Sequence, residues 1–185
     1  MAKYSINLIF ALLGVMLNSC DELIKEGVDT DLPESIDKQY QMYYTKGYQK
    51  LQIGDYSLAI KDFDKAIKLK TNDHNSFYCR GYCYSALKED SIALFDYSRA
   101  IELYPDFSGA FFSRAVSYQL LGNDSLAIID YTKVIKISPD LKDAYFNRGV
   151  SFKNIGDFDK ACKDFNKAIE LGDGKAGSII DQFCR

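Results

Sequence analysis

The chain has 185 residues, 47% of them hydrophobic and 26% charged, and its 23 basic and 26 acidic side chains give a net charge of -3. These proportions are typical of a folded protein with a buried core. No excess of positive charge is available to bind the phosphates of nucleic acids, so we expect no nucleic-acid partner. The sequence contains a single histidine, His74, and no glycine-rich phosphate loop. We therefore expect no catalytic residues, no metal site and no cofactor.

The N-terminus contains an apolar run that is short for a transmembrane helix. Lys3 precedes it, and residues 6–17 are almost uninterruptedly apolar, whereas a membrane-spanning helix needs about 20 residues. The run ends in Leu-Asn-Ser-Cys at residues 17–20. This segment resembles a bacterial lipoprotein signal. The resemblance implies that residues 1–19 form a signal peptide that is removed, and that Cys20 becomes the lipidated first residue.

The residues after the lipidation cysteine predict a tether. Residues 20–39 contain glycine, proline and several polar residues without a sustained apolar period, so we expect a lipidated N-terminus followed by a flexible linker. The lipoprotein resemblance implies a membrane anchor in the bacterial cell envelope, on the outer membrane in preference to the inner membrane, with the periplasmic or surface face left open. Plain secretion and an uncleaved N-terminal anchor are the alternatives.

Beyond the tether the sequence repeats itself with a period of 34 residues. Each unit has an alanine, an aromatic residue four positions later and an isoleucine eight positions later, which is the spacing of one helix face. The alanines are Ala59, Ala93, Ala127 and Ala161, and the aromatic residues are Phe63, Tyr97, Tyr131 and Phe165. Upstream, each unit carries a pair of aromatic residues and then a glycine or alanine. The period predicts stacked units, each with an A helix, a turn and a B helix.

With these offsets the chain resembles the tetratricopeptide repeat (TPR). The resemblance implies an all-α fold, a right-handed α-solenoid of four helix-turn-helix units. The expected units are residues 40–73, 74–107, 108–141 and 142–175. Residues 174–185, which contain several apolar side chains, are expected to form a C-terminal capping helix over the last unit.

The TPR resemblance also implies a concave groove lined by the A helices, in which a partner protein or peptide binds. The expected groove residues are Tyr44, Tyr78, Phe112 and Phe146 in one row, Tyr48, Tyr82, Val116 and Val150 in the next, and Asn147 in a third. Such a surface suits stacking and hydrogen bonding. The alternative is that these aromatic residues recur because they support helix packing. Repeats that clamp a carboxylate use lysine in the first row, so we expect no carboxylate clamp.

Charged residues recur with the same period. A basic residue repeats in the A helices and an aspartate repeats in the B helices. The basic residues are Lys46, Arg80, Arg114 and Arg148, and the aspartates are Asp62, Asp96, Asp130 and Asp164. We expect structural ion pairs between neighbouring helices, because partly desolvated and bidentate pairs contribute more than exposed ones.

Four cysteines follow the lipidation cysteine. Cys79 and Cys83 lie four residues apart on one expected helix, where their side chains are poorly placed for a disulfide. Cys162 and Cys184 lie on the last B helix and the terminal helix and could meet. The sequence leaves open whether they pair.

These observations together predict a non-catalytic scaffold that binds a protein or peptide segment at the bacterial envelope. The alternative is a glycan-binding envelope lipoprotein that uses the groove aromatics, since sugars stack on exposed tyrosine and phenylalanine rings.

Overall fold

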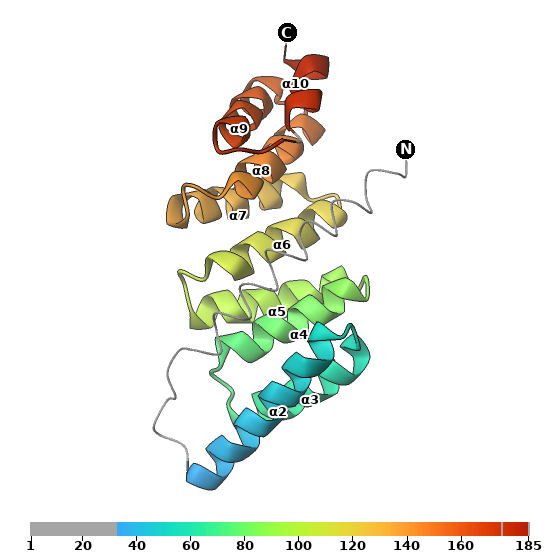
Figure 1. The fold of residues 1–185 in the computed structure, drawn as a ribbon, viewed down its shortest axis with the longest axis vertical. Helices are drawn as coiled ribbons and strands as arrows, with labels where there is room; N and C mark the ends of the chain where they lie inside the picture. The colour runs from blue at the N-terminus through green and yellow to red at the C-terminus, as the bar shows by residue number, and fades with distance from the viewer. Residues whose placement is uncertain (1–32, 175, 185) are drawn as a thin grey trace. The chain divides into compact units, whose positions relative to one another are not determined.

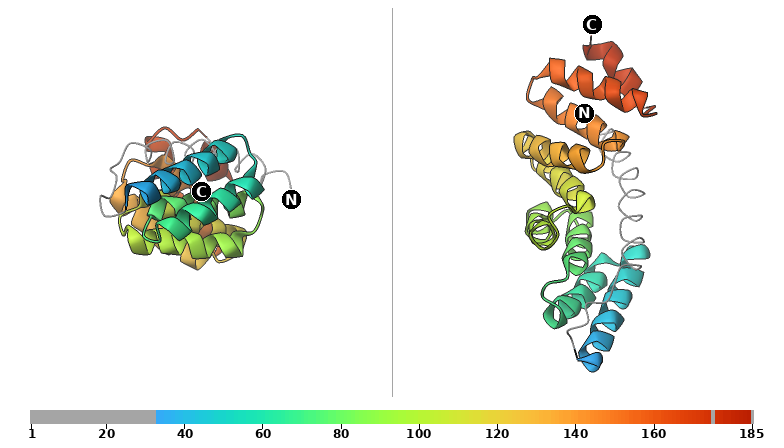
Figure 2. Two further views of the ribbon diagram at one scale, coloured as in Figure 1. Left: turned by 90° about the horizontal axis from the view of Figure 1, so that it is seen from below. Right: turned by 90° about the vertical axis from the view of Figure 1, so that its left-hand side faces the viewer.

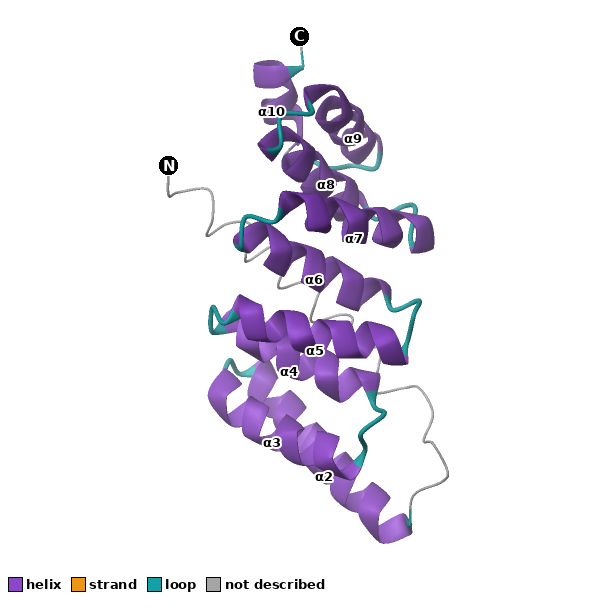
Figure 3. Ribbon diagram, turned by 180° about the vertical axis from the view of Figure 1, so that it is seen from behind, coloured by secondary structure: helices purple, strands orange, loops and turns teal. Residues whose placement is uncertain are grey.

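The computed structural model describes residues 33–174 and 176–184, and this part of the chain is helical, with turns and short loops between the helices (Figures 1 and 3). The helices are α2 (Glu34–Gln52), α3 (Tyr56–Leu69), α4 (His74–Ala86), α5 (Asp90–Leu103), α6 (Ser108–Leu120), α7 (Asp124–Ile137), α8 (Lys142–Asn154), α9 (Phe158–Glu170) and α10 (Ala176–Phe183). The all-α fold class is therefore confirmed. None of the described helices is both long and apolar enough to cross a bilayer.

The chain divides into two compact units, Met1–Glu89 and Asp90–Arg185. In unit 1, α2 packs against α3, and α4 contacts both of them. In unit 2, each helix from α5 to α10 packs against the next, and α6 also contacts α8. The antiparallel pairs can be followed within each unit in Figure 2. The second expected repeat, residues 74–107, is shared between the units, since α4 belongs to unit 1 and α5 to unit 2.

The first A helix begins earlier than the sequence predicts. Residues 34–39 belong to α2, although they were expected in the tether. The apolar face of α2 extends back into this segment, because Ile36 is half-buried and Tyr40 is buried. Glu34 and Asp37 lie in the first turn, where negative charge stabilises a helix N-terminus. The expected signal peptide, Cys20 and the first part of the tether lie in residues 1–32, outside the described residues.

Small residues on the A helices allow the aromatic residues of the B helices to approach closely. A Cβ atom added to Gly47 would lie 3.0 Å from the ring of Phe63, and one added to Gly149 would lie 2.9 Å from the ring of Phe165. These distances are tighter than nearly all Cβ contacts, so glycine at these positions permits the close contact of each helix pair. This explains why the period includes both the small residue and the aromatic residue.

The turn after each A helix, and the turn after α9, use one recurring backbone geometry. Gly54, Gly122, Gly156 and Gly172 end their helices with φ values of 80°, 76°, 83° and 86°. Directly after Gly122, the N–H of Asn123 donates a hydrogen bond to the carbonyl of Tyr118 at 2.8 Å. This is the bond that closes a Schellman motif. Lys88 occupies the same place after α4 with φ 68°. It therefore holds the left-handed conformation that disfavours residues with a Cβ.

The predicted ion pairs are present in unit 2. Arg114 donates from Nε and Nη2 to the two carboxylate oxygens of Asp130 at 2.8 and 2.9 Å. Arg148 donates to Asp164 in the same manner at 2.7 and 2.8 Å. Asp130 and Asp164 are buried. The two pairs join the A and B helices of their repeats through bidentate hydrogen bonds.

In unit 1 the basic residue that pairs with the B-helix aspartate lies elsewhere on α2. The buried Asp62 pairs with Lys50, which lies one turn beyond the expected Lys46 on α2. Lys46 is exposed. Arg80 donates to Asp64 on α3 at 2.6 Å. The position of the basic residue along α2 therefore differs from the pattern of the later repeats.

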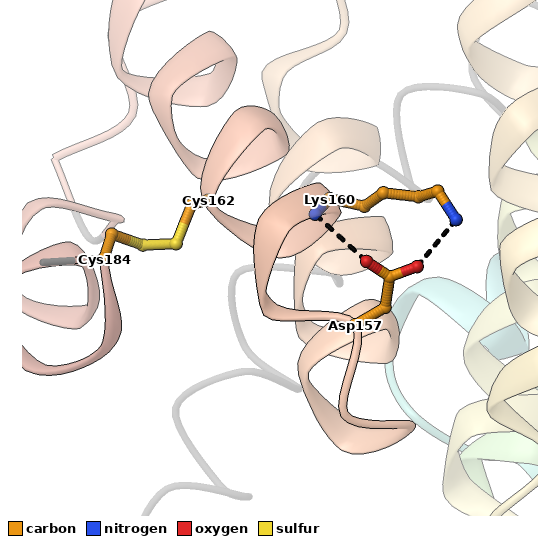
Figure 4. The surroundings of a disulfide bond; sticks show 4 residues. All are labelled: Asp157, Lys160, Cys162 and Cys184. Atoms are coloured by element: carbon orange, nitrogen blue, oxygen red, sulfur yellow. Dashed lines mark hydrogen bonds and ion pairs between the residues drawn. A yellow bond between two sulfur atoms is a disulfide. The ribbon is translucent and has the colours of Figure 1, made fainter.

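A disulfide attaches the capping helix to the last repeat. Cys162 on α9 and Cys184, which directly follows α10, are bonded, and their Cα atoms are 5.6 Å apart (Figure 4). At the other end of α10, the carboxylate of Asp173 accepts a hydrogen bond from the N–H of Ala176 at 3.1 Å. The capping helix is thus held at both ends, and its position agrees with the expected range of residues 174–185.

The N-terminus of α9 carries an aspartate cap beside the disulfide. Asp157 accepts from the backbone N–H of Lys160 at 3.2 Å and from its ammonium at 2.6 Å (Figure 4). The side-chain hydrogen bond from Lys160 lowers the pKa of Asp157. The cap therefore stays ionised at neutral pH.

Candidate functional site

The first row of expected groove residues forms part of the packed interior. The rings of Tyr44, Phe112 and Phe146 contact the aromatic residues of their own B helices. The centroid distances are 5.9 Å for Tyr44–Phe63, 5.5 Å for Phe112–Tyr131 and 5.8 Å for Phe146–Phe165. All three side chains are buried, and Tyr78 in the same row is fully buried. The packing role that the sequence left as an alternative accounts for this row.

The second row offers little more accessible surface. Tyr48, Tyr82 and Val116 are 4%, 6% and 8% exposed, and Val150 is half-buried. The ring of Tyr82 lies edge-on to Tyr56 of α3, with centroids 6.3 Å apart. Both rows lie on the A helices as the sequence predicts, and their part in binding a partner stays a prediction.

Asn147, the expected residue of the third row, is 2% exposed. Its side-chain oxygen is buried and has no hydrogen-bond partner within the described part of the chain. Its backbone carbonyl accepts a hydrogen bond from Gln119 on α6 at 3.0 Å. Asn147 therefore contributes to the contact between α6 and α8 rather than to an open surface.

Gln119 is the centre of a polar network that joins three helices of unit 2. Its Nε2 atom donates to the hydroxyl of Ser151 at 2.8 Å and to the Asn147 carbonyl. The hydroxyl of Tyr131 on α7 donates to Oε1 of Gln119 at 2.6 Å. Burial raises the pKa of Tyr131, so its hydroxyl stays protonated and remains a donor. An amide oxygen can accept two hydrogen bonds, and Oε1 of Gln119 accepts one from the described residues.

Residues that neighbour this network in the sequence are accessible. Gln119 is half-buried, and Leu120 beside it is 47% exposed. On α8, Val150 and Lys153 are half-buried and lie three residues apart, on one helix face. We call Gln119, Leu120, Val150 and Lys153 the α6–α8 face. Its surface combines an acceptor, aliphatic contacts and one positive charge.

The sequence contains a signal for this face. The residues at 34-residue spacing are Leu51, Ser85, Gln119 and Lys153. A position that changes from apolar to polar along the repeats is not reserved for packing, and Gln119 and Lys153 can be identified in this way. Within the described ranges, no three His, Cys, Asp or Glu side chains gather closely enough to hold a metal ion.

Family comparison identifies the repeats. The tetratricopeptide repeat family matches residues 40–73, 108–141 and 142–174. The chain belongs to this family. The matched ranges begin at the boundaries that the sequence period predicts, and the last ends one residue before the expected boundary.

Solved structures show the same fold. A crystal structure of MamA is 28% identical, with a TM-score of 0.71 over 75% of this chain and 81% of that chain. YrrB, described as a TPR protein with an unusual peptide-binding site, is 24% identical, with a TM-score of 0.71 over 77% and 74%. The first TPR of Spaghetti (RPAP3), bound to an HSP90 peptide, is 20% identical, with a TM-score of 0.62 over 64% and 94%. The comparison with curated proteins found no match.

Proposed function

We propose that this TPR protein is a non-catalytic scaffold that binds a segment of a partner protein on the α6–α8 face. The observation that carries the proposal is the half-buried amide of Gln119, whose oxygen is held in place by Tyr131 and retains one acceptor position. A backbone N–H of an extended segment suits this acceptor. The exposed Leu120 offers an apolar contact next to it.

The fixed orientation of the amide favours binding. Gln119 is hydrogen-bonded to both neighbouring helices before any partner arrives. A preordered acceptor loses little conformational entropy on binding. YrrB and RPAP3, which share the fold, are described with a peptide-binding site and a bound peptide.

A protein segment is favoured over a glycan. Sugars stack on open aromatic faces, and the aromatic residues of both expected rows are buried. The α6–α8 face contains an amide, two aliphatic side chains and a lysine, and this combination suits peptide hydrogen bonding better than ring stacking.

A lipid anchor at Cys20 in the bacterial envelope forms part of the proposal. The sequence of residues 1–20 supports it through the resemblance to a lipoprotein signal. The Cys162–Cys184 disulfide also supports it, because disulfides persist mainly in oxidising compartments outside the cytoplasm. Labelling with a fatty acid should mark the wild-type protein and leave Cys20→Ala unlabelled. Equal labelling of the two would contradict the anchor.

Site-specific photo-cross-linking tests the binding face. A photoreactive phenylalanine analogue replaces Leu120 in one variant and Phe95 on α5 in the control, because Phe95 belongs to the same unit and is 63% exposed. In native envelopes we expect one discrete adduct from position 120 and none from position 95. Equal adducts from both positions would contradict the proposal. If protease digestion of the attached partner leaves its mass unchanged, the ligand would instead be a glycan.

A further inference from the structure

The outer face of α3 carries a row of lysines. Lys61, Lys65 and Lys68 are exposed and spaced by four and three residues, so they lie along one side of the helix. Leu58, which is 40% exposed, continues the row toward the N-terminus of α3. We call the three lysines the α3 lysine face.

The acidic residues of α3 do not balance this face. Asp62 is buried and paired with Lys50, and Asp64 is paired with Arg80. No carboxylate of the described residues pairs with Lys61 or Lys68. The ammonium of Lys65 lies over the ring of Tyr43, 4.9 Å from its centroid. The positive charge of the face is therefore directed to solvent.

The equivalent positions form ion pairs in two of the three later repeats, whereas in α7 both are lysines, Lys133 and Lys136, and Lys133 pairs with Asp106. In α5, Arg99 pairs with Glu102 at 2.5 Å, and in α9, Lys167 pairs with Glu170 at 3.0 Å. The equivalents in α3 are Lys65 and Lys68, which are both basic. Like charges one turn apart destabilise a helix. Lys68 also lies in the last turn of α3, where a positive charge stabilises the helix C-terminus and offsets part of this repulsion.

We infer that the α3 lysine face binds the anionic lipid headgroups of the membrane that holds the anchor. This inference rests on the proposed lipid anchor at Cys20. Cys20 and Glu34 are 14 positions apart, and this length of chain reaches at most about 48 Å. Glu34, where α2 begins, is thus held within this distance of the anchor. Lysines within a Debye length of an anionic surface are attracted to it.

Lysine footprinting of the full-length lipidated protein tests the inference. The protein is purified from membranes and reconstituted into vesicles of phosphatidylcholine alone or mixed with phosphatidylglycerol, and acetylation of each lysine is followed by mass spectrometry. We expect acetylation of the α3 lysine face to be roughly fivefold slower in the anionic vesicles, and high salt to reverse this protection. The control, Lys163 on α9, should react equally in both.

A charge variant separates membrane contact from a local effect. In Lys61→Gln/Lys68→Gln, the protection of Lys65 by anionic vesicles should be lost, whereas the matched control Lys163→Gln should retain it. Equal acetylation in both kinds of vesicle would overturn the inference. Slower acetylation of these lysines in native envelopes, but not in the anionic vesicles, would also overturn the inference. It would indicate that an acidic protein binds the α3 lysine face. Failure of the protein to carry acyl chains would refute the anchor itself, and this outcome is distinguished by the mass of the intact protein.

Discussion

The ion pair between Arg114 and Asp130 should be a major contribution to the stability of unit 2. Asp130 is 4% exposed and Arg114 is 19% exposed at the side chain. Arg114 also donates to the hydroxyl of Ser98 at 3.0 Å. Burial lowers the pKa of Arg114, but the hydrogen bonds and charge of Asp130 outweigh this and raise it. The guanidinium is therefore bound more favourably in its charged form.

Replacing Arg114 with methionine keeps most of the aliphatic stem and removes the charge. The carboxylate of Asp130 is then buried without a partner, a change that costs about 3–5 kcal/mol in buried pairs. Because Arg114 is partly exposed, we expect a loss near 3 kcal/mol. For a chain of this size this lowers Tm by roughly 6–12 °C. Thermal unfolding followed by circular dichroism measures the change.

Two comparisons make the prediction specific. Lys38→Met breaks the Lys38–Glu34 pair, whose side chains are 72% and 83% exposed, and should cost less than about 0.5 kcal/mol. Adding Asp130→Asn to Arg114→Met removes the unpaired charge and should recover part of the lost stability. A double variant less stable than Arg114→Met would show that lost packing, not an unpaired carboxylate, causes the effect, and the reasoning would be refuted.

Three further predictions concern the turns, the capping helix and the pH dependence. Lys88→Gly should stabilise the protein by about 0.5–1 kcal/mol, and Gly122→Ala should destabilise it by a similar amount, because both positions need a positive φ. Urea unfolding measures both changes in the free energy of unfolding, and changes of the same sign would contradict the prediction. Cys162→Ser removes the disulfide to Cys184, which lies 22 residues further along the chain. It should lower the free energy of unfolding by about 3 kcal/mol and speed amide exchange in α10. Unchanged exchange would show that the disulfide does not hold this helix. Asp157 has a lowered pKa in the folded state, so its contribution is present at neutral pH and is lost as the pH falls through that pKa; Asp157→Asn should reduce this acid sensitivity, and identical acid unfolding curves would disprove it.

The repeat period predicted A and B helices joined by turns, and the described part of the chain contains them. Alanine and aromatic residues at fixed offsets define one packed face, and glycine marks the ends of α2, α6, α8 and α9. The turn after α4 has Lys88 in place of this glycine, and its backbone still has a positive φ. The repeat spacing therefore predicts the turn even where the glycine is absent. α2 begins before the expected first repeat, since polar residues at its outer face obscured the apolar spacing of Ile36 and Tyr40.

The tertiary structure decided which side chains remain accessible. The period places Phe112 and Gln119 on the same A helix, but it does not show which neighbour covers each of them. Contact with Tyr131 buries the ring of Phe112, whereas Gln119 reaches α8 and keeps part of its amide at the surface. Burial depends on residues from other helices, and local spacing does not contain that information. For the same reason the choice of Lys50 as the partner of Asp62 and the Cys162–Cys184 bond required the packed helices.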